Sequence, residues 1–215
     1  MKEYGELKYF LGIEVAQSKH DIFLSQRKYV LDLLDETDML DCKLVDTPIE
    51  QNHSLGLFPD QVPTHKEWYQ WLVGRLIYLS HTRSDIAYEV SVISQFMHMP
   101  SEAHIDAVIH ILRYLKMAPG RGLDFSKNGH LNVEGYTDAN WVSSITDRQS
   151  TSGYFTFVGG NLVTWRSKKQ KVVARSSVEA EFRDQLADVF TKVVSNSVFS
   201  NSLDKLDMRD IFAPT

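Results

Sequence analysis

The 215-residue sequence has a single cysteine, no long apolar run and no leader-like N-terminus. One cysteine, Cys42, excludes an intrachain disulfide and any zinc site built from several cysteines, which fits a reducing compartment. No apolar run approaches the ~18–20 residues that a membrane span needs. The first residues also lack the basic-then-apolar pattern of a signal peptide. We therefore expect an intracellular protein, cytoplasmic or nuclear and not secreted, with no membrane contact.

The sequence also has no excess of positive charge. The chain carries 28 acidic and 23 basic residues, for a net charge of −5. Any contact with nucleic acid must therefore come from a local basic patch and not from the overall field. Hydrophobic residues make up 43% of the chain and aromatic residues 11%, which is enough for a packed core. The length allows one large domain or two small ones.

The first quarter of the chain predicts a β-hairpin followed by a helix. Residues 7–15 partly alternate between apolar and polar, and residues 22–24 follow a turn-like segment. Ser25 is placed to cap a helix. That helix carries four apolar residues on one face: Tyr29, Val30, Leu33 and Leu34. Residues 51–64 are polar with two prolines, and they predict an exposed loop.

Residues 66–117 have helical periodicity and predict three packed helices. Ser84 and Asp85 open the second helix, and Ser101 caps the third. The first helix is predicted to bury the residues that recur every three or four positions: Trp68, Leu72, Leu76 and Leu79. We interpret the basic positions of this unit as a solvated face: Arg75, Arg83, Arg113 and Lys116.

The second half predicts a strand, a hairpin and a basic stretch. Residues 131–137 form a strand with Asp138 at its end, and residues 153–158 and 162–165 form a hairpin around a Gly-Gly-Asn turn. The hairpin is expected to place three aromatic side chains in the core: Tyr154, Phe155 and Phe157.

The basic stretch from residue 164 to 178 contains no acidic residue. Its side chains suited to phosphate contact and stacking are Trp165, Arg166, Lys168, Lys169, Lys171 and Arg175. Two interpretations stay open, a nucleic-acid-binding surface or a solvated strand edge that lysines protect from pairing.

Several longer motifs resemble the Pol polyproteins of copia-type retrotransposons. They are "LKYFLGIEV", "YQWLVGRLIYLSHTRSDIAY" and "ILRYLK" in the first half, and "GYTDANW", "SSVEAEF" and "QLADVFTK" in the second. The resemblance implies that residues 1–122 are a reverse-transcriptase C-terminal remnant, with a palm-edge hairpin and thumb and connection helices. It implies a partial RNase H-like domain in residues 123–192 and a tail with one short helix at most in residues 193–215. The implied fold class is α/β (α+β), a helical remnant followed by a truncated mixed sheet with helices.

The resemblance also bears on catalysis. No Tyr-x-Asp-Asp sequence occurs in the chain, so we expect no polymerase activity, and the resemblance would put the polymerase's metal-binding aspartates upstream. RNase H hydrolyses RNA with two Mg²⁺ ions about 4 Å apart, held by converging carboxylates. The implied catalytic and metal-binding residues are Asp138, Glu181 (with Glu179 as the alternative) and Asp188. A further acid, which the family has in a Cys-Asp-Asn sequence, is absent, because no Asp-Asn pair occurs here.

The absent acid coincides with an apparent internal deletion, where "EAEF" runs almost directly into "QLADVFTK". If the fused segment is one helix, Glu181 and Asp188 are seven positions apart (188 − 181), which separates their backbones by roughly 10 Å. Carboxylates at that distance do not share a tight metal pair. We therefore expect at most one weak Mg²⁺ site and little or no nuclease activity. In the alternative interpretation these acids are the solvated face of an amphipathic helix.

The implied partners are an RNA–DNA hybrid or RNA, and the rest of the Pol polyprotein. Two other function classes stay open. One is a non-catalytic nucleic-acid-binding module that acts through the basic stretch. The other is a protein-interaction fragment with no nucleic-acid role. The oligomeric state is not predicted.

Overall fold

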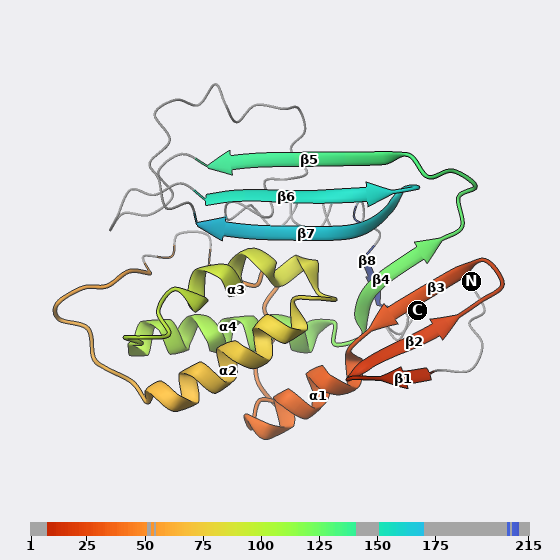
Figure 1. Ribbon diagram of the computed structural model, residues 1–215. Helices are drawn as coiled ribbons and strands as arrows, with labels where there is room; N and C mark the ends of the chain where they lie inside the picture. The colour runs from red at the N-terminus through yellow and green to blue at the C-terminus, as the bar shows by residue number, and fades with distance from the viewer. Residues whose placement is uncertain are drawn as a thin grey trace.

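The computed structural model describes residues 8–50, 53, 55–140, 151–169, 206 and 208–210. A layer of helices lies beside one antiparallel sheet and beneath another in the view of Figure 1. The first sheet has the strand order β1-β2-β3-β4-β8, and the second has the order β5-β6-β7. Helices together with antiparallel sheets confirm the predicted mixed α/β class.

The first strands and helix are β1 (Lys8–Phe10), β2 (Ile13–Gln17), β3 (Asp21–Ser25) and α1 (Arg27–Glu36). The predicted hairpin is confirmed, since β2 and β3 pair antiparallel. The apolar stretch before it splits into two strands, because Leu11 and Gly12 both adopt positive φ and form a tight turn between β1 and β2. The helix is confirmed too, and it buries Val30, Leu33 and Leu34.

The predicted cap of α1 is wrong. Ser25 is the last residue of β3, and the helix begins after Gln26 without a side-chain cap from that residue. The hydroxyl of Ser25 donates to Glu14 Oε2 at 3.1 Å, and Glu14 Oε1 accepts the backbone N–H of Lys28 at 3.2 Å. The carboxylate of Glu14 on the neighbouring strand thus accepts a backbone N–H that the first turn of the helix leaves without a partner. The spacing of residues around Ser25 in the sequence does not reveal this contact.

The helical unit consists of α2 (Lys66–Leu79), a 3₁₀ turn η1 (Ser84–Ile86), α3 (Ala87–Ser94) and α4 (Glu102–Met117). The three helices are confirmed, but Trp68 is 39% exposed, and Tyr69 occupies the core instead. The predicted cap of α4 is confirmed, and it is reciprocal because the N–H of Ser101 donates to Nδ1 of His104. The core residues of α2 are Tyr69, Leu72, Val73, Leu76 and Leu79.

One hydrophobic core joins the helices to both sheets, since Phe155, Leu162 and Met208 share a cluster with residues of α1, α2, α3 and α4. Strand β4 (Arg121–Ser126) pairs with β3 and with β8 (Met208–Asp210). The predicted boundary between residues 122 and 123 falls inside β4, and the division into domains stays a prediction. In the described part of the tail, β8 is a strand where a short helix at most was predicted.

The second sheet consists of β5 (Val133–Asn140), β6 (Thr151–Val158) and β7 (Asn161–Lys169). The predicted hairpin is confirmed: Gly159 and Gly160 connect β6 to β7 with φ of 56° and 77°, the positive values that a two-residue hairpin turn requires. Phe155 and Phe157 are buried as predicted. Tyr154 is 42% exposed, so its core prediction is wrong, because successive strand residues face opposite sides.

No helix in the described part of the chain is long and apolar enough to cross a membrane.

Candidate functional site

The three strands of the second sheet place side chains in rows that cross the sheet. Directly opposed residues of antiparallel strands have their side chains on the same face. One row is Tyr136–Phe155–Trp165, and the next is Asp138–Gly153–Ser167. Phe155 is fully buried in the core, and Tyr136 stacks on it at 4.9 Å. Asp138 therefore lies on the face of the sheet that packs toward the helices.

Asp138 is partly buried within β5, two residues before the strand ends at Asn140. Its neighbours across the sheet, Gly153 and Ser167, supply no carboxylate. Among the residues that the structure describes, no group of three or more His, Cys, Asp or Glu side chains is placed to hold a metal ion. Glu181 and Asp188, and the alternative Glu179, lie outside the described residues. The described surroundings of Asp138 therefore do not fit a two-metal site.

The basic residues on β7 do not form one surface with Trp165. Arg166 pairs with Tyr154, and Lys168 pairs with Ser152, so both cations project from the face opposite Trp165. The indole Nε1 of Trp165 donates to the carbonyl of Ser80 at 3.0 Å, which fixes the ring against the helical layer. Lys169 ends β7, and nothing is described of its side chain. Lys171 and Arg175 lie outside the described residues.

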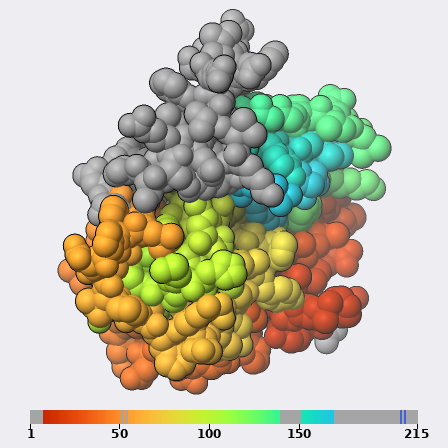
Figure 2. Space-filling model, turned by 60° about the vertical axis from the view of Figure 1, so that its left-hand side comes forward, coloured from red at the N-terminus to blue at the C-terminus, as the bar shows by residue number. Residues whose placement is uncertain are grey.

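A groove of about 670 Å³ lies between β7 and helices α2 and α3, and we refer to it as the β7 groove. Six consecutive residues of β7, 163–168, line one side of it. The opposite side includes Ser80 and His81 after α2, and Ser91 and Ser94 on α3. Figure 2 shows the surface of the β6–β7 hairpin, in cyan and blue, next to the yellow and green surface of the helices. The buried Oγ of Ser167 has no hydrogen-bond partner among the described residues.

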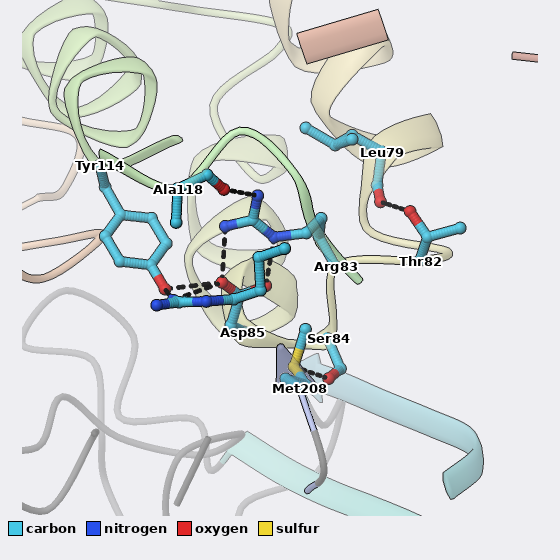
Figure 3. A network of polar contacts seen from close by, with 9 residues as sticks. Leu79, Thr82, Arg83, Ser84, Asp85, Tyr114, Ala118 and Met208 are labelled. Atoms are coloured by element: carbon cyan, nitrogen blue, oxygen red, sulfur yellow. Dashed lines mark hydrogen bonds and ion pairs between the residues drawn. The ribbon is translucent and has the colours of Figure 1, made fainter. Parts of the chain in front are cut away.

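A buried polar network supports the helical layer beneath this sheet (Figure 3). Arg83 donates from Nε and Nη2 to the two carboxylate oxygens of Asp85, at 2.8 and 2.7 Å, and from Nη1 to the carbonyl of Ala118 at 3.0 Å. The hydroxyl of Tyr114 donates to Asp85 Oδ2 at 2.6 Å. Arg121, on β4, adds an ion pair to the same oxygen at 3.4 Å. The network joins η1, the end of α4 and the start of β4.

The interpretation of Arg83 as part of a solvated face is therefore wrong, because its side chain is almost completely buried. Burial by itself raises the pKa of Asp85, but the charge of Arg83, its hydrogen bonds and Arg121 outweigh burial and lower that pKa to about 2. Asp85 stays ionised, so the two buried charges neutralise each other.

A second buried carboxyl lies one turn further along, at Glu89 on α3. Its Oε2 atom has no hydrogen-bond partner in the part of the chain that the structure describes. Burial raises the pKa of Glu89 well above its ordinary value, and the negative charge of Asp85 raises it further. Sequence reasoning placed Asp85 at the start of a helix but did not predict that Asp85 and Glu89 are buried, because Asp and Glu side chains are ordinarily exposed.

Comparison with known proteins identifies relatives of the chain, which the geometry of the site alone does not reveal. The chain is 45% identical over 183 residues to the "Retrovirus-related Pol polyprotein from transposon RE1" of Arabidopsis thaliana, a match that covers 85% of this chain and 12% of the relative. It is 38% identical over 194 residues to the corresponding polyprotein from transposon TNT 1-94 of Nicotiana tabacum, covering 85% of the chain and 14% of the relative. It is also 39% identical over 183 residues to an uncharacterized mitochondrial protein of Arabidopsis thaliana, AtMg00810, covering 85% of the chain and 76% of the relative.

The chain thus spans only 12–14% of the length of these Pol polyproteins. No protein-family model matches the chain, and no solved structure matches it significantly.

Proposed function

This chain belongs to the family of retrovirus-related Pol polyproteins of copia-type retrotransposons, of which it is a fragment, and from that premise we propose that β5, β6 and β7 begin an RNase H-like domain. The ancestral role of such a domain is Mg²⁺-dependent hydrolysis of the RNA strand in RNA–DNA hybrids. We propose that this chain has lost that activity wholly or almost wholly. Its proposed partners are an RNA–DNA hybrid or RNA, and the rest of the polyprotein.

The observation that carries the proposal is the place of Asp138. It lies near the end of the first strand of a three-stranded antiparallel meander, β5-β6-β7. That is the position at which the family resemblance implies the first catalytic acid. Its side chain faces the helical side of the sheet, where a second and third carboxylate would have to approach it.

The proposed loss of activity rests on the missing carboxylate. Two Mg²⁺ ions need several hard oxygen ligands within a few ångströms of one another. The neighbours of Asp138 on β6 and β7 are Gly153 and Ser167, and the chain has no Asp-Asn pair to supply the acid that the family carries there. Asp138 can therefore bind and orient one cation weakly but cannot hold two.

Titration calorimetry with Mg²⁺ tests this proposal. We expect at most one weakly bound ion, whose heat of binding disappears in Asp138→Asn. The matched control is Asp32→Asn, an exposed substitution on α1 that removes the same charge. Two bound Mg²⁺ ions, both abolished in Asp138→Asn and retained in the control, would overturn the proposal.

A further inference from the structure

Strand β8 completes the hydrophobic core from a distant part of the chain. Leu206 and Met208 are both buried, and they belong to the same cluster as Leu123 of β4 and the core residues of the helices. The hydroxyl of Ser84, which lies 124 positions earlier, donates to the thioether sulfur of Met208 at 2.9 Å (Figure 3). This short segment therefore occupies core space beside β4 that would otherwise be open to water.

The attachment of β8 to its sheet is short and one-sided. Three residue pairs join it to β4, from Leu123 with Met208 to Arg121 with Asp210. Among the described strands β8 is the last of its sheet, so its release breaks no other strand pairing there. Segments that few contacts hold in place open at a lower free energy than the whole fold does. We therefore expect β8 to detach while the pairing of β3 with β4 stays formed.

Release of β8 has two costs, and both fall at the same place. The backbone groups of β4 that pair with β8 lose their partners, and an open strand edge is a template for pairing with another chain. The core also loses the apolar side chains of Leu206 and Met208, whose burial stabilises the docked segment. A segment that relieves both costs must be extended, and it must carry apolar side chains with the spacing of Leu206 and Met208.

We propose that the edge of β4 is a strand-acceptor site, and that it takes the β8 segment of a second copy of this chain. Each copy carries both the acceptor edge and the segment that fits it. Reciprocal exchange of β8 therefore keeps the contacts of the closed chain and joins two copies into a symmetric dimer. The β8 strand of the same copy competes for the edge and so acts as an autoinhibitory strand. The proposal does not rest on the proposed nuclease ancestry, and Asp138→Asn should leave the exchange unchanged.

Fluorescence anisotropy of the full chain with a labelled peptide of residues 203–212 tests the acceptor site. The parent chain should bind the peptide weakly, because its own β8 occupies the edge of β4. Leu206→Ala/Met208→Ala, which we call the β8-weakened variant, should bind the peptide at least about tenfold more tightly. Loss of about two buried methylene groups already shifts an equilibrium tenfold, and these substitutions remove more than that. A peptide with Leu206→Asp/Met208→Asp should not bind.

The matched control is Leu131→Ala/Met99→Ala, which truncates one leucine and one methionine that are both exposed. It should bind the peptide as weakly as the parent chain does. Ser84→Ala, added to the β8-weakened variant, should weaken binding of the peptide. It should not affect a peptide in which norleucine replaces Met208, because norleucine has no sulfur to accept a hydrogen bond from the hydroxyl.

Native mass spectrometry of the parent chain tests the exchange between copies. We expect a dimer whose fraction rises with protein concentration and falls when the peptide is added in excess. The β8-weakened variant should form less of this dimer, because its own strands fill the acceptor edge poorly.

Three results would overturn the proposal. The first is a peptide that binds the β8-weakened variant no better than it binds the control. The second is the absence of a dimer that excess peptide reduces. The third is loss of the far-UV circular dichroism of the parent chain both in the β8-weakened variant and in the milder Met208→Ala, which would show that β8 does not detach from the fold on its own.

Discussion

The guanidinium group of Arg83 holds both carboxylate oxygens of Asp85, at 2.8 and 2.7 Å, in a site closed to solvent. Two residues that are separated only by Ser84 in the sequence thereby fix the turn between α2 and α3. Through Ala118 and Arg121 they also fix the start of β4. Because β4 leads into the second sheet, this ion pair helps to set where β5, β6 and β7 lie on the helices (Figure 1).

Asp85→Asn should destabilise the fold strongly. The substitution leaves the buried charge of Arg83 without a counter-charge, which typically costs about 3–5 kcal/mol. Urea denaturation followed by circular dichroism measures the change in the free energy of unfolding. Asp32→Asn, which removes one partner of the exposed Lys28–Asp32 pair, is the control and should produce no measurable change. Similar effects of the two substitutions would show that the Arg83–Asp85 pair is not closed to water.

Glu89→Gln should stabilise the protein at neutral pH. Burial holds the pKa of Glu89 well above its ordinary value of 4.5 in the folded chain. As the pH rises, the unfolded chain loses this proton first. The protonated side chain of Glu89 therefore contributes its full stability only below the pKa of the unfolded chain. That contribution is lost as the pH rises toward the higher pKa of Glu89 in the folded chain. Glutamine stays neutral, so the variant should be the more stable protein at about pH 7 and as stable as the parent at about pH 3.

Urea denaturation over this pH range measures the effect of Glu89. Glu102→Gln is the matched control, since Glu102 is exposed in the first turn of α4, and it should give no gain at neutral pH. A gain in Glu102→Gln equal to that in Glu89→Gln would mean that net charge, and not burial, is responsible.

Gly122→Ala should loosen the five-stranded sheet. A Cβ atom at Gly122 would lie 2.0 Å from the carbonyl oxygen of Leu24 on β3, a contact that requires the backbone to move. Gly135→Ala, in β5, is the control, because its Cβ would meet nothing within 4 Å. We expect a loss of at least about 1 kcal/mol for Gly122→Ala and little change for Gly135→Ala. Comparable thermal midpoints for the two variants would contradict the pairing of β3 with β4.

Sequence reasoning found the elements whose signals are local. Apolar periodicity predicted α1, α2, α3 and α4, and the Gly159-Gly160 pair predicted the β6–β7 hairpin because few other residues adopt positive φ. The same reasoning misplaced Trp68 by one position. Helical period alone does not distinguish two adjacent aromatic residues at the edge of an apolar stripe.

What sequence reasoning missed depends on contacts between distant residues. Glu14 caps α1 from another strand, Met208 pairs as a strand with β4, and the carboxylate of Asp85 that holds Arg83 is also bound by Tyr114 on α4 and Arg121 on β4. In the candidate site, Asp138 was found by resemblance to a family. The separation of Trp165 from Arg166 and Lys168 onto opposite faces follows from strand alternation once β7 is known to extend through Lys169. The predictions for Glu181, Asp188, Lys171 and Arg175 stay predictions.

The proposed loss of nuclease activity is tested by cleavage of an end-labelled RNA–DNA hybrid with the chain, in Mg²⁺ and in Mn²⁺, beside Asp138→Asn. We expect no cleavage above the background of that variant in either metal, because the proposed metal pair would lack one of its carboxylates. Cleavage by the parent chain that Asp138→Asn abolishes would contradict this expectation, and would mean that another acid has taken the place of the missing one.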